Sequence, residues 1–385
     1  MGLSRRQFLV MAGSASGLGL AFLSQRLFAQ GNAPPTPAPV TPVSPPTPMT
    51  ESVGPAGLFA PQRGDVRIVV ISDLNSQYGS TDYEPEVDKA IALIPDWKPD
   101  LVLCGGDMVA GQYPSLTKPE IQAMWAGFDR HIGAPLRQAQ LPYGFTVGNH
   151  DASGALAIGG QPLFAQERDL ATAHWNDPRH DPGIPFVDRA GFPFYYTFEQ
   201  KQVFYLVWDA STSIIPQAQL DWAAQSLASP AAQKAKMRIV IGHLPLYAVA
   251  VGRDELGEIL ARAEELRSLL ERYRVHTYIS GHDHAYYPAH QGKLQLLHCG
   301  ILGSGPRPLL NSHLPTEKTL TVIDIDLNAE STTYTTYDAV NLQVVDFKKL
   351  PRLIVGPNGR VLRRDIEITD LTPAEQALTW VSSTS

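Results

Sequence analysis

The chain has 385 residues, 44% of them hydrophobic and 18% charged, and its formal net charge is −7 at pH 7. A net negative charge disfavours nucleic acid as a partner, because proteins that bind nucleic acid neutralise its phosphates with Lys and Arg. Only two cysteines are present, Cys104 and Cys299, which excludes a disulfide framework and a zinc cluster built on thiolates. Both lie in apolar, strand-like runs, and we therefore expect two buried free thiols rather than one disulfide.

Residues 1–29 have the composition of an export signal. Arg5 and Arg6 precede Gln-Phe-Leu, a weakly apolar run covers residues 10–23, and Leu-Phe-Ala at 27–29 offers a cleavage site. The segment resembles a twin-arginine signal, which export machinery reads as an address. An ordinary secretory signal or a retained anchor is the alternative, but a membrane-spanning helix needs about 20 strongly apolar residues. We expect a periplasmic or extracellular protein whose mature form has no stable membrane span.

A proline-rich linker is predicted for residues 30–64. Ten prolines fall between residues 31 and 61, among Thr, Ala and Gly, and such a composition cannot bury a core. The main body then begins near Asp65 and contains about 320 residues, enough for one large domain. Since the signal holds three arginines and no acidic residue, its removal takes the net charge from −7 to −10.

In the body, short apolar runs alternate with amphipathic segments, which is typical of α/β layering. Residues 66–72 (VRIVVIS) predict a buried strand that ends at Asp73, and residues 101–104 predict a second strand that ends shortly before Asp107. Between them, apolar positions within 85–95 keep helical spacing, with a proline at each end.

A capping box from Thr117 to Glu120 predicts a helix whose apolar face continues to Ile132. Residues 143–147 then predict a third strand, which delivers the motif GNHD at 148–151. Polar groups thus gather at the carboxyl ends of the strands, which is where open α/β sheets bind ligands.

The stretch 152–192 has little strand pattern, several prolines and polar residues such as His174 and His180. Long irregular insertions in compact domains are usually functional loops or covers. We interpret this stretch as an insertion or lid beside the site, and a surface loop without ligand contact is the alternative.

The second half repeats the pattern of apolar runs that end in polar motifs. Residues 237–241 lead into Gly-His243, and residues 276–280 present the motif GHDH at 281–284. Between these strands, apolar positions from 256 to 273 predict one long amphipathic helix. The other elements predicted in this part are strands at 194–198 and 203–208 and a helix at 216–227.

The C-terminal region returns to strand patterns at 320–325 and 331–337, and we place the end of the main domain (65–345) after them. Residues 346–385 predict a small appendage without catalytic residues. It consists of a hairpin around the sequence Gly-Pro-Asn-Gly at 356–359 and one short helix that follows a capping box at Thr372.

Five strand ends therefore carry the ordered set SDLN, GGD, GNHD, GH and GHDH, each after an apolar run. Single GD and GH dipeptides occur by chance in most chains, but the ordered set is specific. From about residue 66 to about residue 300, the chain resembles the calcineurin-like metallophosphoesterase family. The resemblance implies an α/β fold, namely a four-layer α/β/β/α sandwich with a mixed double β-sheet. It also implies hydrolysis of phosphomonoesters or phosphodiesters.

The resemblance further implies a two-metal centre. The ligands implied are, in chain order, Asp73, Asp107, Asn149, His243, His282 and His284. Asp73 and His284 would hold the first ion, Asp107 would bridge, and the other three would complete the second. Oxygen and imidazole donors suit Mn, Fe or Zn better than Ca or Mg. Two divalent or trivalent ions about 3.5 to 4 Å apart bind both oxygens of a phosphoryl group and lower the pKa of a bridging water, which yields a hydroxide nucleophile.

His150, Asp151 and Arg307 complete the predicted site. His150 resembles the family's histidine that contacts phosphate and protonates the leaving oxygen, and Asp151 would orient it and favour its charged form. Asn149, His150 and Arg307 are the candidates for binding the phosphate-ester substrate, since a guanidinium matches phosphate oxygens. A solvent-facing arginine on a glycine-rich loop is the alternative for Arg307. Asp283, between two implied ligands, is interpreted as structural.

Asn75 departs from the family pattern. Most members carry a histidine two residues after the first aspartate, whereas Asp73-Leu-Asn75 places an amide there. An amide oxygen is a weaker donor than imidazole, so Asn75 as a ligand would hold the first ion less tightly, or it could hold a metal-bound water. This position keeps two alternatives open: a mononuclear phosphoesterase, and a non-catalytic binding protein of the same fold. The chain also has Ala110 where purple acid phosphatases carry a tyrosine, which disfavours that subfamily.

Replacement of Asn75→His is expected to raise the affinity for the first ion, because imidazole is the stronger donor. Metal content measured during dialysis against a chelator should fall more slowly in the variant than in the parent protein. Equal metal retention by the two proteins would count against Asn75 as a ligand position.

Overall fold

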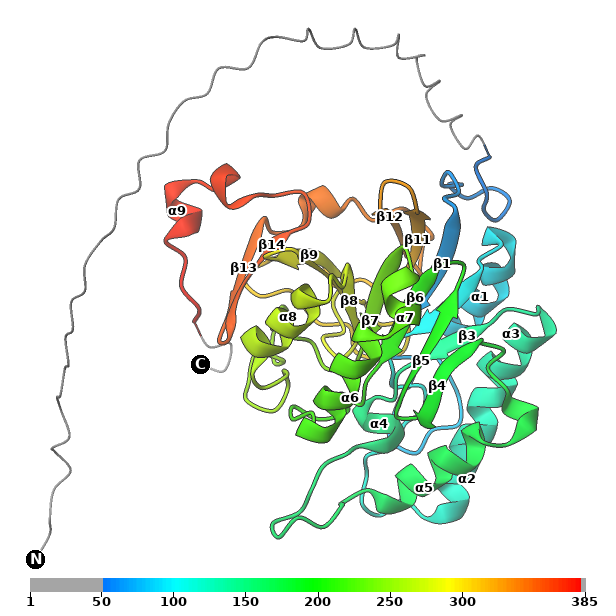
Figure 1. Cartoon of the computed structure of the whole chain (residues 1–385). Coiled ribbons are helices and arrows are strands. Elements are labelled where there is room, and N and C mark those ends of the chain that lie inside the picture. Colours follow the sequence, from blue (N-terminus) through cyan, green and yellow to red (C-terminus); the bar gives the residue numbers. More distant parts are fainter. Residues whose placement is uncertain (1–50, 382–385) are drawn as a thin grey trace, which may run out of the picture. The chain divides into compact units, whose positions relative to one another are not determined.

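The computed structural model describes residues 51–381 (Figure 1). The predicted signal peptide and most of the predicted linker lie outside the described residues. Within residues 51–381, no helix has the length and apolar character required to cross a membrane. The described chain is organised around two β-sheets.

The first sheet has five strands in the order β12-β11-β1-β2-β3. β1, β2 and β3 are parallel, and β11 pairs antiparallel with both β1 and β12. The carboxyl ends of β1, β2 and β3 therefore lie at one edge, as expected from the sequence. The strands of this sheet are β1 (Val66–Ile71), β2 (Leu101–Cys104), β3 (Tyr143–Phe145), β11 (Thr319–Asp326) and β12 (Ser331–Asp338).

The second sheet has nine strands in the order β13-β14-β9-β10-β8-β7-β6-β5-β4. Its centre, β6-β7-β8-β10, is parallel, and the outer strands are antiparallel. Both sheets are thus mixed, which confirms the predicted fold class. The strands are β4 (Phe186–Gly191), β5 (Tyr195–Gln200), β6 (Val203–Val207), β7 (Met237–Ile241), β8 (Thr277–Ser280), β9 (Tyr287–Gln291), β10 (Leu294–His298), β13 (Leu353–Gly356) and β14 (Gly359–Arg363).

Alternation along the central strands of the second sheet divides the interior into two cores. Val203, Tyr205 and Val207 of β6 belong to the larger core, which also holds β1 to β3 and the buried faces of α1 and α2. Phe204 and Leu206 point the other way, into a smaller core with α6 and α8. Successive side chains of a strand face opposite sides of the sheet, so each face of the second sheet covers one core. The layers therefore follow in the order helix, sheet, sheet and helix.

The helices of the body begin largely where their sequence signals predict. The Thr117 N–H donates to Glu120 Oε2 at 2.7 Å, as the capping box requires. The longer helices are α1 (Pro85–Leu93), α2 (Lys118–Phe128), α5 (Ala165–Trp175), α6 (Gln217–Ala228) and α8 (Ala263–Arg272). The shorter ones are α3 (Ala134–Gln138), α4 (Asn149–Ala152), α7 (Pro230–Lys234) and α9 (Pro373–Gln376).

The prediction of one long helix from 256 to 273 is wrong. Helix α8 begins only at Ala263, since Gly257 has φ +100° and Arg262 has φ +61°, both in the left-handed region. Leu256, which the periodicity assigned to a buried face, is fully exposed. Residues 254–262 instead form a loop that brings Glu258 to the functional site.

The insertion 152–192 is more regular than expected. It contains α5, and its last part forms β4, the edge strand of the second sheet. Arg168 of α5 ties the insertion to the body through an ion pair with Asp209 at 2.7 Å and a hydrogen bond to the Ala152 carbonyl at 2.8 Å. The chain between α4 and α5 projects away from the sheets (Figure 1).

The C-terminal hairpin consists of β13 and β14, and it is part of the second sheet. β14 pairs antiparallel with β9, with Leu362 opposite His290. Thr372 caps α9 through the hydrogen bonds of the expected capping box. The hairpin therefore extends the nine-stranded sheet.

Candidate metal centre and active-site pocket

The carboxyl ends of five strands from the two sheets bring the implied ligands together. Asp73 and Asp107 follow β1 and β2, and His243 follows β7. One ligand atom from each of these three residues lies within 4.8 Å of the others, and all three side chains are buried. Two carboxylates and an imidazole from distant parts of the chain thus form a buried group suited to a metal ion.

A second set of ligand atoms surrounds Asn149. Its Oδ1 lies 2.9 Å from His243 Nε2 and 3.0 Å from His282 Nδ1. The two ring nitrogens are 3.3 Å apart, and His243 Nε2 is also 3.3 Å from Asp107 Oδ2. Ligands bound about 2.0 to 2.1 Å from one tetrahedral zinc stand about 3.3 Å apart. The four side chains are therefore spaced as ligands of a single ion.

Two ligand atoms are buried without a hydrogen-bond partner among the described residues. These atoms are Asp107 Oδ2 and His284 Nε2, and His284 Nε2 lies 3.3 Å from Asp73 Oδ1. An unsatisfied buried polar atom costs about 1 to 3 kcal/mol. Because a cation would satisfy both atoms, the donor set of Asp73, Asp107 and His284 fits the position expected for the first ion.

Each of the three ligand histidines uses its other ring nitrogen in an outward hydrogen bond. His243 Nδ1 lies 2.8 Å from the Gly105 carbonyl, and His284 Nδ1 lies 2.9 Å from the Gly305 carbonyl. His282 differs, because its Nε2 lies 2.9 Å from Glu258 Oε2. Such contacts fix the ring orientation and leave the inner nitrogen free to bind metal.

Glu258 is a site residue that the sequence analysis missed. It lines the pocket, forms a hydrogen bond with His282 Nε2 and forms an ion pair with Arg253. The hydrogen bond with His282 lowers the pKa of Glu258 to about 2, so this carboxylate is ionised at neutral pH. The one available signal was Gly257, a glycine inside the helix that we predicted.

Four of the ligand residues have a left-handed backbone. The φ angles are +52° for Asp73, +54° for Asp107, +68° for His282 and +53° for His284. Non-glycine residues rarely adopt this region, and such residues concentrate at functional sites. Gly148 shows how tightly the backbone is packed here, because a Cβ at this position would lie 2.0 Å from Asp107 Oδ1.

Opposite charges within the centre shift the pKa values of its groups. Burial lowers the pKa of His243, but Asp107 outweighs it and raises the pKa to about 9. Burial raises the pKa of Asp107, yet His243 and His150 hold it well below its ordinary value. A proton on His243 must leave before its Nε2 can bind an ion, so acid should compete with metal.

His150 lies at the pocket beside the metal ligands. Its Nδ1 is 3.0 Å from the Gly111 carbonyl, and its Nε2 is 3.9 Å from Asp107 Oδ2. The ring packs against Tyr78 with 5.2 Å between ring centroids, and both residues line the cavity. A histidine in this position can exchange a proton with a bound substrate.

The structure does not support the expectation that Asp151 orients the imidazole of His150. Asp151 is fully buried and accepts hydrogen bonds from the backbone N–H groups of Met108, Val109 and Gly148 at 2.7 to 2.9 Å. The Nδ1 atom of His150 is paired with a carbonyl instead. Asp151 therefore holds together the two loops that follow β2 and β3.

A hydrogen-bond chain from the insertion orients Asn149. Glu167 of α5 accepts the N–H of Gln112 at 3.1 Å, and Gln112 Oε1 accepts from Asn149 Nδ2 at 2.7 Å. With Nδ2 engaged in this way, Oδ1 of Asn149 faces the two histidines. Glu167 and Gln112 were also missed, because neither lies in a recognisable motif.

Arg307 and Asn75 lie in adjoining loops. Arg307 lines the same cavity as Asn149 and His150, and its Nη1 donates to the Val251 carbonyl at 3.2 Å. Asn75 is buried, and its backbone N–H and C=O pair with Asp107 and Ser304. The role of the Asn75 side chain as a ligand stays a prediction.

Two further expectations concern residues that take no part in the proposed reaction. Asp283 points away from the metal centre, and its Oδ2 lies 2.7 Å from His298 Nδ1 in a buried pair. Asp283 is therefore structural, as predicted. Cys104 and Cys299 are free and buried, which confirms two unpaired thiols.

Comparisons with known proteins identify the family and the fold. The family model described as calcineurin-like phosphoesterase matches residues 66–286. A search of curated protein sequences found no match.

Solved structures with the same fold include the purple acid phosphatase PPD1 from yellow lupin (Lupinus luteus). Its TM-score is 0.52 at 17% identity, over 75% of this chain and 55% of the lupin chain. Two further structures are more distant. GAP50 from Plasmodium has a TM-score of 0.44 at 13% identity, over 73% of this chain and 86% of the GAP50 chain. A putative 5'-nucleotidase from Staphylococcus aureus has a TM-score of 0.41 at 14% identity, over 70% of this chain and 52% of the nucleotidase chain. This chain spans about half the length of the lupin protein, and the likeness shows the fold alone.

Replacement of Glu258→Gln is expected to weaken metal binding by on the order of 10- to 100-fold, as is usual when the carboxylate partner of a ligand histidine is lost. Competition with a chromogenic chelator would measure the affinity. Glu265→Gln is the matched control, since Glu265 is exposed and pairs only with Arg262 on the surface. Equal affinities for all three proteins would show that Glu258 does not support the metal ligand.

Proposed function

Because this chain belongs to the calcineurin-like phosphoesterase family, we propose that it is a metal-dependent hydrolase of phosphomonoesters or phosphodiesters. The observation that carries the proposal is the convergence of ligand atoms from five strand ends. Two of these atoms are buried and unpaired, beside a cavity of about 750 Å³.

Two ions of Mn, Fe or Zn would fit the donor set. Asp73 and His284 would hold one ion, Asn149, His243 and His282 the other, and Asp107 would contact both. When bound, such ions supply Lewis acidity toward phosphoryl oxygens and lower the pKa of water, so that hydroxide is available as the nucleophile.

The protein's own residues would bind the ester and manage the proton. In our proposal, Nδ1 of His150 donates to the Gly111 carbonyl, and the ring in its cationic form carries a second proton at Nε2. The Nε2 proton passes to the leaving oxygen, and the ring is left neutral. Arg307 and the Asn149 amide face the same cavity and would bind phosphoryl oxygens. Asp151 supports the reaction by holding the loop that carries His150.

The two metal positions differ in their number of donors, which favours a mononuclear enzyme as the second candidate. Asp107, Asn149, His243 and His282 give one position four side-chain donors, whereas the position at Asp73 has a histidine replaced by Asn75. Metal analysis combined with a mono- and diester assay separates the candidates. One ion with turnover supports the mononuclear enzyme, and two ions without hydrolysis of any ester support a binding protein.

Replacement of His150→Gln is expected to lower kcat by on the order of 10²- to 10⁴-fold, with metal content unchanged, because the general acid is lost. The loss should be larger for alkyl phosphates than for p-nitrophenyl phosphate, whose leaving group needs no proton. His131→Gln is the control, since His131 pairs with Asp88 at the surface. An equal loss on both substrates would contradict proton transfer by His150.

We also propose that the protein is exported through the twin-arginine route to the periplasm or the cell exterior. The support is the sequence pattern around Arg5 and Arg6, which lie outside the described residues. Changing both to lysine should trap the protein inside the cell, and fractionation with immunodetection would measure this. Unchanged secretion would refute the assignment.

A further inference from the structure

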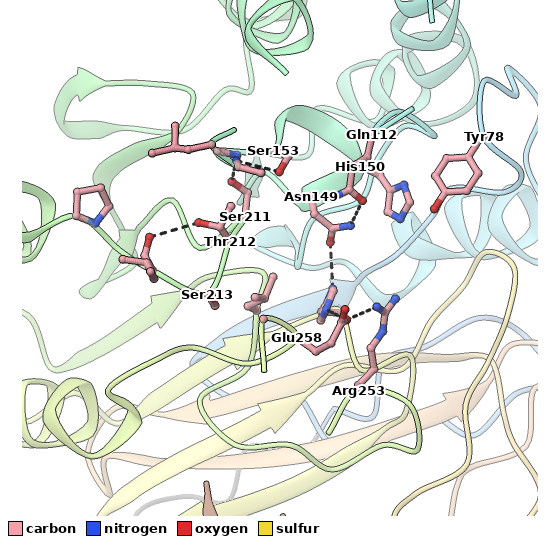
Figure 2. Close-up of a pocket in the computed structure, with 18 of the residues that line it drawn as sticks. Tyr78, Gln112, Asn149, His150, Ser153, Ser211, Thr212, Ser213, Arg253 and Glu258 are labelled. Carbon is pink, nitrogen blue, oxygen red and sulfur yellow. Dashed lines mark hydrogen bonds and ion pairs between the residues drawn. The ribbon is translucent and has the colours of Figure 1, made fainter. Parts of the chain in front are cut away.

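The cavity extends well beyond the metal ligands. Its volume of about 750 Å³ is in the range of pockets that hold whole small molecules, and a phosphoryl group fills only a small part of it. Figure 2 shows Ser211, Thr212 and Ser213 across the cavity from Tyr78 and Arg253, with Asn149 and His150 between them. The far flank, formed by residues 153–156 and 211–214, is therefore placed to contact the group attached to the phosphoryl.

Aliphatic side chains line this flank and are open to the cavity. Leu156 is 61% exposed and Ile214 is 69% exposed, and both line the same cavity as Asn149 and His150. Large apolar side chains that remain exposed in a concave site mark a surface for an apolar ligand.

Three of the four hydroxyl groups of the flank, all except that of Ser213, have partners among the described residues. Ser211 Oγ donates to Asp209 at 2.6 Å and accepts from the Gly154 N–H at 3.0 Å. Ser153 Oγ accepts from the Ala155 N–H at 3.2 Å, and Thr212 Oγ1 donates to the Ile214 carbonyl at 3.3 Å. These hydroxyls hold the two segments in shape, so the flank has few free polar atoms for a ligand.

Charge is divided between the two sides of the cavity. Residues 152–166 and 210–220 contain no Asp, Glu, Lys, Arg or His. The charged groups Arg253, Glu258 and Arg307 lie with the metal ligands instead. One side thus suits an anionic phosphoryl group, and the other suits an uncharged, apolar group.

We infer that the flank of Leu156 and Ile214 is the leaving-group subsite, and that the preferred substrates are phosphoesters of apolar alcohols. This inference rests on the proposed function, because it assumes that a phosphoryl group lies at the metal ligands. Sugar and glycerol phosphates would leave the aliphatic flank in contact with polar groups and are poorer substrates.

A series of methyl, butyl and hexyl phosphates tests the inference, because these alcohols have similar leaving-group pKa values and differ in apolar size. We expect kcat/KM to rise along the series by on the order of tenfold or more, with glycerol phosphate near methyl phosphate. Leu156→Ser and Ile214→Ser should each reduce the gain for hexyl phosphate and leave the methyl ester unchanged. A flat series overturns the subsite.

Ile158→Ser is the matched control, since Ile158 lies on the same projecting loop, is fully exposed and does not line the cavity. It should behave like the parent protein. An equal loss in this variant would show that the effect does not depend on contact with the cavity, and would overturn the inference.

Calorimetry with butyl- and hexylphosphonate separates this inference from the proposed function. Tighter binding of the longer phosphonate without hydrolysis of any ester supports the subsite and refutes the enzyme. Turnover without a dependence on chain length refutes the subsite alone.

Discussion

The buried carboxylate of Asp107 is the group on which the candidate metal centre depends. Its Oδ1 accepts the backbone N–H of His150 at 2.8 Å, and its Oδ2 lies 3.3 Å from His243 Nε2 without a hydrogen-bond partner. Asp107 follows a strand of one sheet and His243 a strand of the other, so they meet only when the sheets pack face to face. A buried carboxylate needs positive charge beside it, which either protonated His243 or a bound cation can supply. The packing of the two sheets therefore creates a site where a proton on His243 competes with a metal ion.

The backbone conformation of the predicted ligands is a second unfavourable contribution to the free energy of folding. Asp73, Asp107, His282 and His284 all have positive φ, and each such residue costs of order 1 to 3 kcal/mol. Buried strands precede these residues. Asp151 accepts the backbone N–H of Met108, and Ser72 donates to the carboxylate of Asp73. The packed strands and these hydrogen bonds hold the backbone in the left-handed region.

Most of the strands could be predicted, because each polar motif directly follows a short apolar run, and the set of ligands was implied by the resemblance of these ordered motifs to the family. The errors arose where local periodicity misled or where contacts are distant in sequence. Leu256 and Ile259 continue the spacing of α8 toward the N-terminus. The helix nevertheless begins only after Arg262, whose left-handed backbone leaves no trace in the sequence. Glu258 meets His282 across 24 residues, and α5 has too weak an apolar face to be recognised. Asp151 was predicted to orient His150. Its partners are instead backbone N–H groups, which no pattern of side chains reveals.

The contact of Glu167 with Gln112 has a consequence for how this protein can diverge or be engineered. Insertions of this kind are usually treated as exchangeable modules that change specificity and leave the catalytic frame intact. Here Glu167 of the insertion accepts the N–H of Gln112, and the Gln112 side chain accepts from the amide of Asn149. A graft or deletion that removes α5 would free a metal ligand as well as reshape the pocket. With Asn149 as a metal ligand, as proposed, a change at Glu167 or Gln112 would affect metal affinity, whereas a change at Leu156 in the same insertion would affect specificity alone.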